Sequence, residues 1–359
     1  MSRSLNHIII GISGGVDSAV AAYLLKQAGH HVEGMFMKNW ADDDDHCPIE
    51  QDLNDAQTVC DQLRIPLTVV NFADHYWADV FSVCLEDFRR GLTPNPDILC
   101  NKEIKFNYFL NYAKQLGAQY IATGHYARTI QDEIHTHLLK GCDSSKDQSY
   151  FLYALNQSKL AQSLFPLGDL HKHQVRKLAK ELGLKNAEKK DSTGICFIGE
   201  RKFKTFLNDY LPAKPGPIET AEGERLGQHD GLMFYTIGQR QGLAIGGKKN
   251  KTELPWYVAD KDVKRNALIV VQGNTHPALF KTTIITSTIH WIATPPPLPC
   301  TIFAKTRYRQ ADQACQIQQI GGLYHIIFDQ PQRAVTKGQS IVFYQGDICL
   351  GGGIIEEYY

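Results

Sequence analysis

The sequence lacks the features of a membrane protein, a secreted protein or a cysteine-rich domain. No stretch of its 359 residues approaches the ~18 consecutive apolar residues of a membrane helix, and a short polar lead stands where a signal peptide would be. The nine cysteines are an odd number and never form C-x-x-C, which argues against a disulfide framework and a ribbon-type zinc site. We expect a cytoplasmic protein without a membrane partner, whose cysteines are mostly small buried hydrophobic residues.

The chain also lacks net charge, because 38 Lys and Arg residues balance 38 Asp and Glu residues. The charges are nevertheless segregated along the sequence. Residues 41–61 contain eight Asp or Glu residues and no Lys or Arg, whereas residues 140–204 contain thirteen Lys or Arg and seven Asp or Glu residues. This segregation is compatible with one surface that binds an anionic ligand and another that repels it, although a solvated helix face is the commoner explanation of each segment.

The length predicts two or three domains, of which the first is an α/β domain at residues 1–210. Short apolar runs alternate there with amphipathic stretches, a pattern typical of a doubly wound parallel sheet with helices on both faces. The predicted strands are residues 8–12, 32–37, 67–71 and 120–123, and the predicted helices are residues 17–28, 51–63, 74–88, 102–116 and 173–182.

The remaining sequence predicts two β domains. Residues 211–217 read LPAKPGP, which is too rich in proline to continue a helix. A second break at residues 272–277 separates a small, mostly β middle domain, residues 211–275, from a C-terminal β-barrel-like domain, residues 276–359. The predicted strands in this half are residues 256–259, 267–271, 281–285, 301–308, 325–328 and 340–344.

Residues 13–18 read SGGVDS and predict a phosphate-binding loop. They follow the apolar run at residues 8–10 and open a predicted helix, so that unpaired backbone N–H groups add to the positive end of the helix dipole. Glycines allow a close approach of the anion, and the serines offer hydroxyl donors. The loop has neither the lysine and spacing of G-x-x-x-x-G-K-[ST] nor the pattern G-x-G-x-x-G. An ordinary strand–turn–helix corner is the alternative interpretation.

Two cysteines lie in basic, turn-rich segments. Cys100 closes the loop at residues 91–100 and leads into a predicted helix beside Lys102, where the pKa of a thiol is expected to fall. Cys196 lies in DSTGICFI, residues 191–198. Two lysines precede this segment, and an arginine and a lysine follow it. From the residues alone, a packed and inert thiol is the commoner state of either cysteine.

These motifs together resemble a known family. Residues 13–18 are similar to the SGGxDS signature of the PP-loop ATP pyrophosphatases, and with the two cysteine segments the chain resembles the bacterial tRNA-specific 2-thiouridylases. The similarity covers nearly the whole chain and includes NPDILCNKEIKF at 95–106, TGHY at 123–126, KDQSYFL at 146–152, TIGQR at 236–240, RYRQ at 307–310 and GGGII at 351–355. The one difference is Ile12, where the family often has methionine.

The resemblance implies a tRNA-uridine 2-sulfurtransferase that uses ATP and magnesium. Such an enzyme thiolates the wobble uridine in the anticodon stem-loop of the tRNAs for Lys, Glu and Gln. ATP adenylates the 2-oxo group, releasing pyrophosphate, and sulfur then displaces AMP. By resemblance, Cys196 receives sulfur as a persulfide from a cysteine-desulfurase relay protein. Cys100 either attacks this persulfide to release sulfide or resolves the product as a Cys100–Cys196 disulfide.

The family also implies roles for residues around the nucleotide. Asp17 is the expected magnesium ligand, since a carboxylate suits a hard cation, although an acid also suits the first turn of a helix. Asp97 is the expected general acid/base beside the target uridine, with an Asx-turn acid as the alternative role. Met37 has the alternative role of a core residue. The implied ATP-binding residues are Gly11, Ile12, Ser13, Gly14, Gly15, Val16, Asp17, Ser18, Met37 and Gly124.

Modification of a base in an anticodon loop requires that the base leave its stack and enter a pocket. Within the predicted strand at 301–308 and just beyond it, Lys305, Arg307 and Arg309 alternate with other residues, which predicts a one-sided cationic stripe for the tRNA backbone. A charged strand edge that resists aggregation is the alternative. The residues implied to contact tRNA are Asn95, Pro96, Asp97, His125, Lys146, Asp147, Gln148, Lys305, Arg307, Tyr308, Arg309 and Gln339. His125 has the alternative role of a structural histidine.

Other functions are compatible with part of this pattern. Another PP-loop adenylating enzyme, such as an amidotransferase-linked synthetase, needs neither paired cysteines nor C-terminal β domains. A thiolase that makes 2-thiocytidine uses C-x-x-C ligands for an iron–sulfur cluster, and the sequence has no C-x-x-C. A non-catalytic nucleotide-sensing or RNA-binding protein predicts that substitution of the cysteines is harmless.

Overall fold

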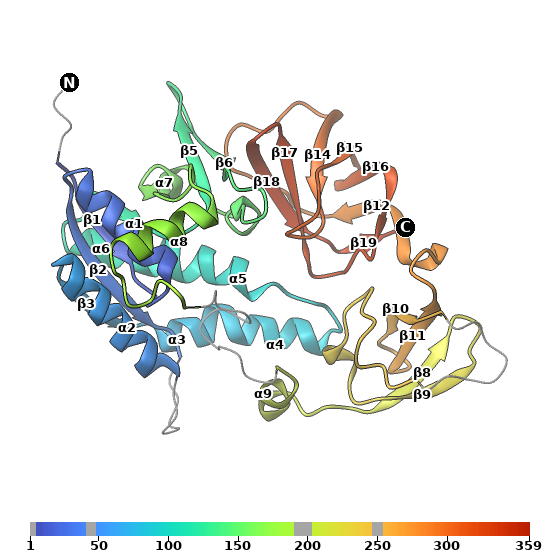
Figure 1. Ribbon diagram of the computed structural model, residues 1–359. Coiled ribbons are helices and arrows are strands. Elements are labelled where there is room, and N and C mark those ends of the chain that lie inside the picture. The colour runs from blue at the N-terminus through green and yellow to red at the C-terminus, as the bar shows by residue number, and fades with distance from the viewer. Residues whose placement is uncertain (1–4, 41–47, 190–202, 246–253) are drawn as a thin grey trace.

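The computed structural model describes residues 5–40, 48–189, 203–245 and 254–359. Three parts follow one another along the chain: a parallel sheet with helices, a small β domain and a larger β domain at the C-terminus (Figure 1). Among the described residues, every helix is too short or too polar to cross a lipid bilayer. The predicted order of an α/β domain and two β-rich domains is confirmed.

The N-terminal part is built on a parallel sheet with the strand order β3-β2-β1-β4-β7. Its central strand β1 is an isoleucine run that is buried on both faces, as expected for an interior parallel strand. The four strands predicted from apolar runs are confirmed. The strands are β1 (His7–Gly11), β2 (His31–Lys38), β3 (Leu67–Asn71), β4 (Tyr120–Ala122) and β7 (Ser163–Leu164).

Helices cover both faces of this sheet. Ile8 and Ile10 pack against helices of one face, and Ile9 packs against helices of the other, which confirms the doubly wound arrangement. The segments Trp77–Phe81 and Cys100–Phe109 continue neighbouring helices in a wider π-helical geometry. The α-helices are α1 (Val16–Gln27), α2 (Pro48–Leu63), α3 (Ala73–Tyr76), α4 (Ser82–Arg89), α5 (Pro96–Leu99), α6 (Leu110–Gln115), α7 (Gln157–Leu160), α8 (Lys172–Glu181) and α9 (Phe203–Tyr210).

One helix begins earlier than predicted. The Asn95 side chain accepts hydrogen bonds from the backbone N–H groups of Asp97 (3.2 Å) and Ile98 (3.3 Å), and Pro96 occupies the first helical turn. Both are strong signals for a helix start. The helix therefore begins at Pro96 instead of residue 102, and the expectation that Cys100 lies at a helix N-terminus is wrong.

A hairpin that the sequence analysis missed joins the first and last parts of the chain. Strands β5 (Ala127–Gln131) and β6 (Thr136–Lys140) leave the parallel sheet, and β6 pairs with β18 (Ile348–Ile354). Leu139 lies opposite Ile348 in this pairing. The N-terminal domain thus contributes two strands to the C-terminal sheet. The strands β12–β19 of this sheet lie at the upper right of Figure 1.

The middle domain is a four-stranded sheet with the order β10-β11-β8-β9 and its own apolar core. Its strands are β8 (Gly216–Thr220), β9 (Arg225–His229), β10 (Trp256–Asp262) and β11 (Ala267–Gln272). The C-terminal sheet has the order β19-β12-β16-β15-β14-β17-β18-β6-β5, with β13 beside β18. Its further strands are β12 (Phe280–Thr286), β13 (His290–Trp291), β14 (Cys300–Lys305), β15 (Gln313–Ile320), β16 (Leu323–Arg333), β17 (Ser340–Gln345) and β19 (Glu357–Tyr358).

The predicted cationic stripe on this sheet is wrong. Strand β14 ends at Lys305, and the chain then turns, with the Gln310 backbone N–H donating to the Arg307 carbonyl (3.1 Å). The period-two alternation therefore stops where the stripe was expected to begin. Lys305 is buried, whereas Arg307 and Arg309 are exposed, so the three cations do not form one exposed stripe.

Candidate active site

The loop between β1 and α1 is shaped by its own side chains. The Ser18 hydroxyl accepts a hydrogen bond from the Ser13 N–H (3.2 Å) and donates to the Gly15 carbonyl (3.1 Å). Gly14 has φ +73°, and a Cβ there would lie 2.6 Å from the Asp52 carbonyl oxygen, so only glycine fits. Gly15 is the N-cap of α1. The loop thus forms a compact turn at the positive end of a helix, as an anion site requires.

Asp17 forms a partly buried ion pair that the sequence did not predict. Its two carboxylate oxygens each accept a hydrogen bond from Lys172 Nζ (2.7 Å), and one also accepts from the Tyr126 hydroxyl (2.8 Å). Lys172 is buried at the start of α8. In this arrangement the carboxylate does not fit a magnesium ion, because the ammonium group occupies the side that a cation would bind. Magnesium binding by Asp17 stays a prediction that requires Lys172 to move.

The acidic and basic segments neutralise each other beside this loop. Lys189 Nζ binds Asp52 (2.8 Å) and Asp55 (2.6 Å) of α2, and the Asn186 amide donates to the Gly14 carbonyl (3.0 Å). At these residues the two segments meet instead of forming separate attractive and repulsive surfaces. The segregation of charge along the sequence was the available signal for these contacts. It could not indicate that the acidic and basic segments are neighbours in the fold.

The other predicted ATP-binding residues lie along the same edge of the sheet. A Cβ at Gly11 would lie 3.3 Å from Met37 Cε, and a Cβ at Gly124 would lie 2.9 Å from the Ser18 nitrogen. Gly124 therefore lets the end of β4 pack directly against the first turn of α1. Ile12 and Val16 are buried core residues, and Met37 is also buried in a core.

His125 has the contacts of a buried neutral imidazole. Thr123 Oγ1 and His125 Nδ1 are 2.7 Å apart, and the ring packs near Phe106 and Phe165. Burial, with a smaller contribution from Lys105, lowers the pKa of His125 well below its ordinary value. These contacts are those of a structural histidine, and a contact with tRNA stays a prediction.

Asp97 and Cys100 lie on one helical segment. Asn95 caps this helix, so the alternative role of Asp97 as the Asx-turn acid is wrong. Cys100 is completely buried among apolar residues of the N-terminal core, one turn after Asp97. Cys196, its predicted partner, lies outside the described residues.

Four of the other described cysteines, Cys60, Cys84, Cys315 and Cys349, are buried, as inert thiols usually are. Burial is the main reason that the pKa values of Cys60, Cys84 and Cys315 are raised to about 12. Complete burial raises the pKa of Cys349 still further. Cys142 is exposed. The expectation that most cysteines are small buried residues is confirmed for the part of the chain that the structure describes.

The loop before Asn95 is held by both β domains. Lys261 Nζ lies 3.3 Å from Thr93 Oγ1, and the Gln339 amide donates to the Thr93 carbonyl (2.7 Å). The Thr93 N–H also donates to the Lys337 carbonyl (3.0 Å). Gln339, a predicted tRNA contact, is thus a link to the segment that carries Asp97 and Cys100.

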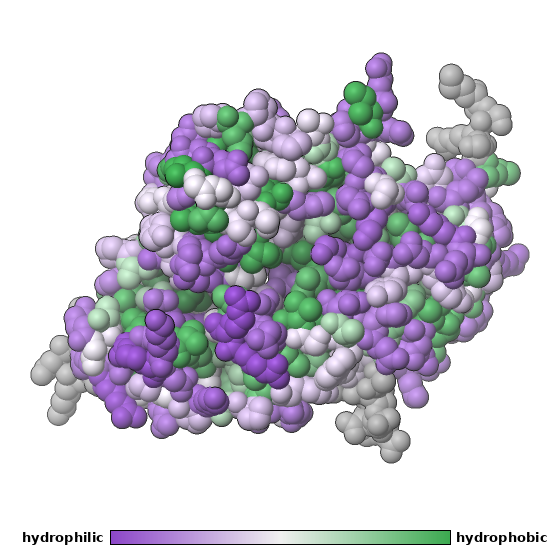
Figure 2. All heavy atoms as spheres, turned by 180° about the vertical axis from the view of Figure 1, so that it is seen from behind, coloured by the Kyte–Doolittle hydropathy of each residue, from purple (hydrophilic) through white to green (hydrophobic). Residues whose placement is uncertain are grey.

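Figure 2 shows the molecule from behind the view of Figure 1. This face is hollowed near its centre.

Five further predicted tRNA contacts lie at or beside a second junction, between the first and last domains: Lys146, Asp147, Gln148, Lys305 and Tyr308. The Tyr308 hydroxyl donates to the Lys146 carbonyl (3.2 Å), and Lys305 pairs with the buried Asp147 (3.5 Å). The Gln148 side chain accepts from the Tyr126 N–H (2.9 Å).

Arg307 links the C-terminal domain to the middle domain. Its guanidinium donates to the carbonyls of Ile237 and Ala334, at 2.8 Å each. Lys305 and Asp147 are therefore buried in protein contacts, whereas Arg307 and Arg309 are both exposed, although Arg307 is also held by its two carbonyl acceptors.

Comparisons with known proteins agree on one family. Residues 6–200 match the family described as tRNA methyl transferase HUP domain, residues 204–272 the tRNA methyl transferase PRC-barrel domain, and residues 281–355 the aminomethyltransferase beta-barrel domain. The tRNA-specific 2-thiouridylase MnmA of Legionella pneumophila (strain Paris) is 58% identical over 98% of both chains. The proteins of that name from Citrobacter koseri and Escherichia coli O1:K1 / APEC are 57% and 56% identical, over 99% of this chain and 98% of their own lengths.

Proposed function

The chain belongs to the tRNA-specific 2-thiouridylase family, and from that premise we propose that it thiolates the wobble uridine of the tRNAs for lysine, glutamate and glutamine at the expense of ATP. The observation that carries the proposal is the juxtaposition at the carboxyl edge of the parallel sheet. The SGGVDS loop lies there, and the helical segment that begins with Asp97 and Cys100 ends beside the same edge, with its Phe109 ring 3.6 Å from the Cβ position of Gly11. Ligands of doubly wound sheets bind at this edge.

Activation of the uridine is assigned to the loop and to Lys172. The 2-oxo group is a poor leaving group, so attack of this oxygen on the α-phosphate of ATP forms an adenylated uridine and releases pyrophosphate. The negative charge that develops needs donors already in place. The start of α1 supplies backbone N–H groups, and Lys172 supplies a cation that the loop itself lacks.

Sulfur delivery is assigned to Cys196 and Cys100. The terminal sulfur of a Cys196 persulfide attacks C2 of the uridine, and AMP leaves with the former 2-oxo oxygen. The Cys100 thiolate then attacks the Cys196 sulfur, which frees 2-thiouridine and leaves a Cys100–Cys196 disulfide. In the alternative order, Cys100 first releases hydrosulfide, which then attacks C2. Either order ends in the disulfide, which an external thiol reduces, and a cysteine-desulfurase relay reloads the persulfide.

Asp97 is proposed to move the proton during these steps. It lies in the first turn of α5, half-buried and one turn before Cys100. Its backbone N–H is bound by Asn95, so the cap fixes where the carboxylate can reach. Magnesium is proposed to assist the phosphate chemistry when bound, and no step is assigned to it.

The tRNA is proposed to bind across the junctions between the domains. Asn95, Pro96, Lys146 and the exposed Arg309 are proposed to contact tRNA directly. Arg guanidinium groups grip phosphate oxygens bidentately, which suits Arg309 for the backbone. The remaining predicted contacts, including His125 and Gln339, are proposed to hold the pocket around the flipped uridine.

The proposal is tested by product analysis. The protein is incubated with ATP, magnesium, unmodified glutamate tRNA, and cysteine with a cysteine-desulfurase relay as the persulfide source, and the nucleosides are separated and identified by mass spectrometry. We expect 2-thiouridine at the wobble position only. A tRNA with cytidine at that position is the matched control and should gain no sulfur. Formation of 2-thiocytidine, or no thiolated nucleoside in protein that cleaves ATP, would contradict the proposal.

A further inference from the structure

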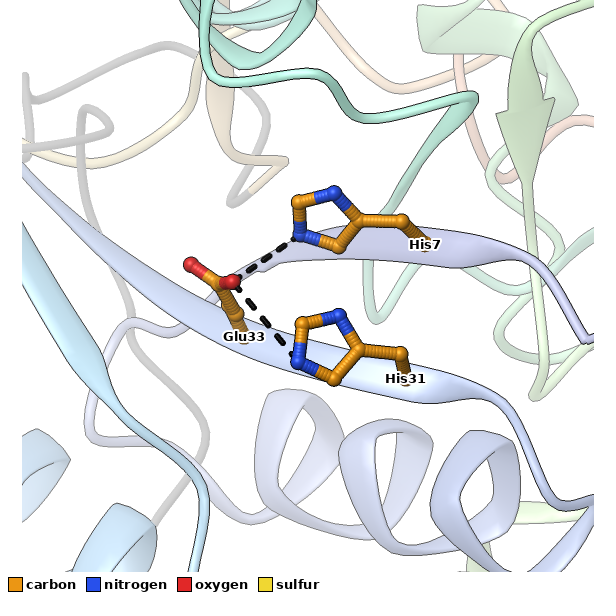
Figure 3. A group of neighbouring side chains, drawn as sticks. All are labelled: His7, His31 and Glu33. Atoms are coloured by element: carbon orange, nitrogen blue, oxygen red, sulfur yellow. Dashed lines mark hydrogen bonds and ion pairs between the residues drawn. The ribbon is translucent and has the colours of Figure 1, made fainter.

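Three potential metal ligands lie together at the sheet edge opposite the SGGVDS loop. His7 is the first residue of β1, and His31 is the first residue of β2, directly opposite it in the parallel register. Glu33 follows two residues after His31, so strand periodicity places all three side chains on one face. Figure 3 shows both imidazole rings directed toward the Glu33 carboxylate.

The geometry is close to that of a coordination site. Glu33 Oε1 lies 3.0 Å from His7 Nε2 and 3.9 Å from His31 Nε2, and the three ligand atoms lie within 4.8 Å of one another. Zinc binds imidazole nitrogen and carboxylate oxygen at ~2.0–2.2 Å, so tetrahedral ligand atoms lie roughly 3.3–3.5 Å apart. Only His31 has to rotate appreciably, and its side chain is 65% exposed and able to do so.

We propose that His7, His31 and Glu33 bind a divalent transition metal of the zinc class, with water in the open position. Two imidazoles and one carboxylate favour zinc or its neighbours, whereas magnesium and calcium prefer all-oxygen sites. Without metal, His7 Nε2–H donates to Glu33. Binding requires the lone pair of Nε2 to face the metal, so this proton moves to His7 Nδ1 or to water. The solvent-facing ring of His31 leaves room for the water ligand.

The site joins the first residues of two central strands and lies at the opposite end of β1 from the loop at residues 13–18. A metal there links β1 to β2 directly, in addition to their backbone pairing. It is therefore a stabilising site and takes no part in sulfur transfer. We expect zinc to raise the thermal unfolding midpoint, because a ligand that binds only the folded state stabilises it.

The test uses tag-free, full-length protein titrated with cobalt(II), followed by zinc competition. Four- or five-coordinate cobalt gives visible absorption bands, and thiolate ligation adds a near-ultraviolet charge-transfer band that would reveal binding by cysteine instead. We expect visible bands without the thiolate band. His7→Gln, His31→Gln and Glu33→Gln should each weaken binding by at least 10–100-fold, the loss typical even of groups that only support metal ligands.

Two histidine variants are matched controls. His30→Gln changes the neighbour of His31, and His137→Gln changes a histidine that pairs with a single aspartate. Both should retain the cobalt bands and the zinc-dependent rise in unfolding temperature. Circular dichroism of the ligand variants should match the parent protein. Equal cobalt binding by His7→Gln, or bands of thiolate character, would overturn the proposal, whereas the thiolation assay bears only on the proposed function.

Discussion

Replacement of Gly338 by alanine should damage catalysis through the loop that precedes Asn95. Gly338 has φ +87°, and a Cβ there would lie 2.9 Å from the Thr93 nitrogen and 3.0 Å from Leu92 Cβ. Real Cβ atoms do not approach a backbone nitrogen this closely, so residues 92–93 must shift. Because the hydrogen bonds of this loop lead directly into the cap of the Cys100 helix, the shift is transmitted to Asp97 and Cys100.

Gly322 in the same domain provides the matched control. Its φ is +83°, and a Cβ there would meet nothing within 4 Å. Alanine in this backbone conformation is unfavourable by roughly 1–2 kcal/mol at either position. Overpacking adds a further ~1–3 kcal/mol at Gly338 alone. The difference between the two variants therefore isolates the contact with the loop.

The assay combines denaturant unfolding with single-turnover thiolation. Gly322→Ala should lose only the folding stability that the unfavourable backbone conformation of alanine costs, and it should retain the parent rate of thiolation. Gly338→Ala should lose more stability and react about 100-fold more slowly, the effect of a ~1 Å displacement of a catalytic group. Equal rates in the two variants would refute the idea that this loop positions Asp97 and Cys100.

Three further predictions concern charge and sulfur. Burial lowers the pKa of Lys261 to about 8 from its ordinary 10.5. Between these two pH values the unfolded chain binds more protons than the folded one, so the free energy of unfolding rises with pH. Lys261→Met should abolish that rise when unfolding is measured as a function of pH. Asp17→Asn and Lys172→Met should each slow pyrophosphate release. A double-mutant cycle of unfolding free energies should give a coupling of about 0.5–3 kcal/mol between the two residues. Additive losses of stability would argue against the ion pair. Cys196→Ser should fail to load persulfide in a mass-spectrometric assay, whereas Cys100→Ser should load it and deliver none; transfer by both variants would exclude the pairing.

The elements that could be predicted are those with local signals. The apolar run at residues 8–10 and the glycine-rich turn after it identified the central strand and the phosphate loop. The end of the strand at Lys305 could not be predicted in this way, because β-compatible residues continue to Tyr308 while a Thr306–Gln310 side-chain bond (2.9 Å) stabilises a turn. Local propensity was overridden there by side-chain bonding.

The site was predictable in its motifs but not in its long-range pairs. Residues 155 positions apart form the Asp17–Lys172 ion pair, and 246 positions separate Thr93 from Gln339. No periodicity in one sequence encodes such neighbours. The start of the Cys100 helix was available from the Asn95-Pro96 pair, whose capping signal is local.

In the proposed reaction ATP activates the uridine oxygen itself, and an isotope experiment tests this step directly. A glutamate tRNA whose wobble uridine carries the heavy oxygen isotope at its 2-oxo group is thiolated in ordinary water. Adenylation at that oxygen predicts that the AMP released by the reaction carries the heavy isotope, one atom for each 2-thiouridine formed, with pyrophosphate unlabelled. Unlabelled AMP, or ADP and phosphate as the products, would contradict the account.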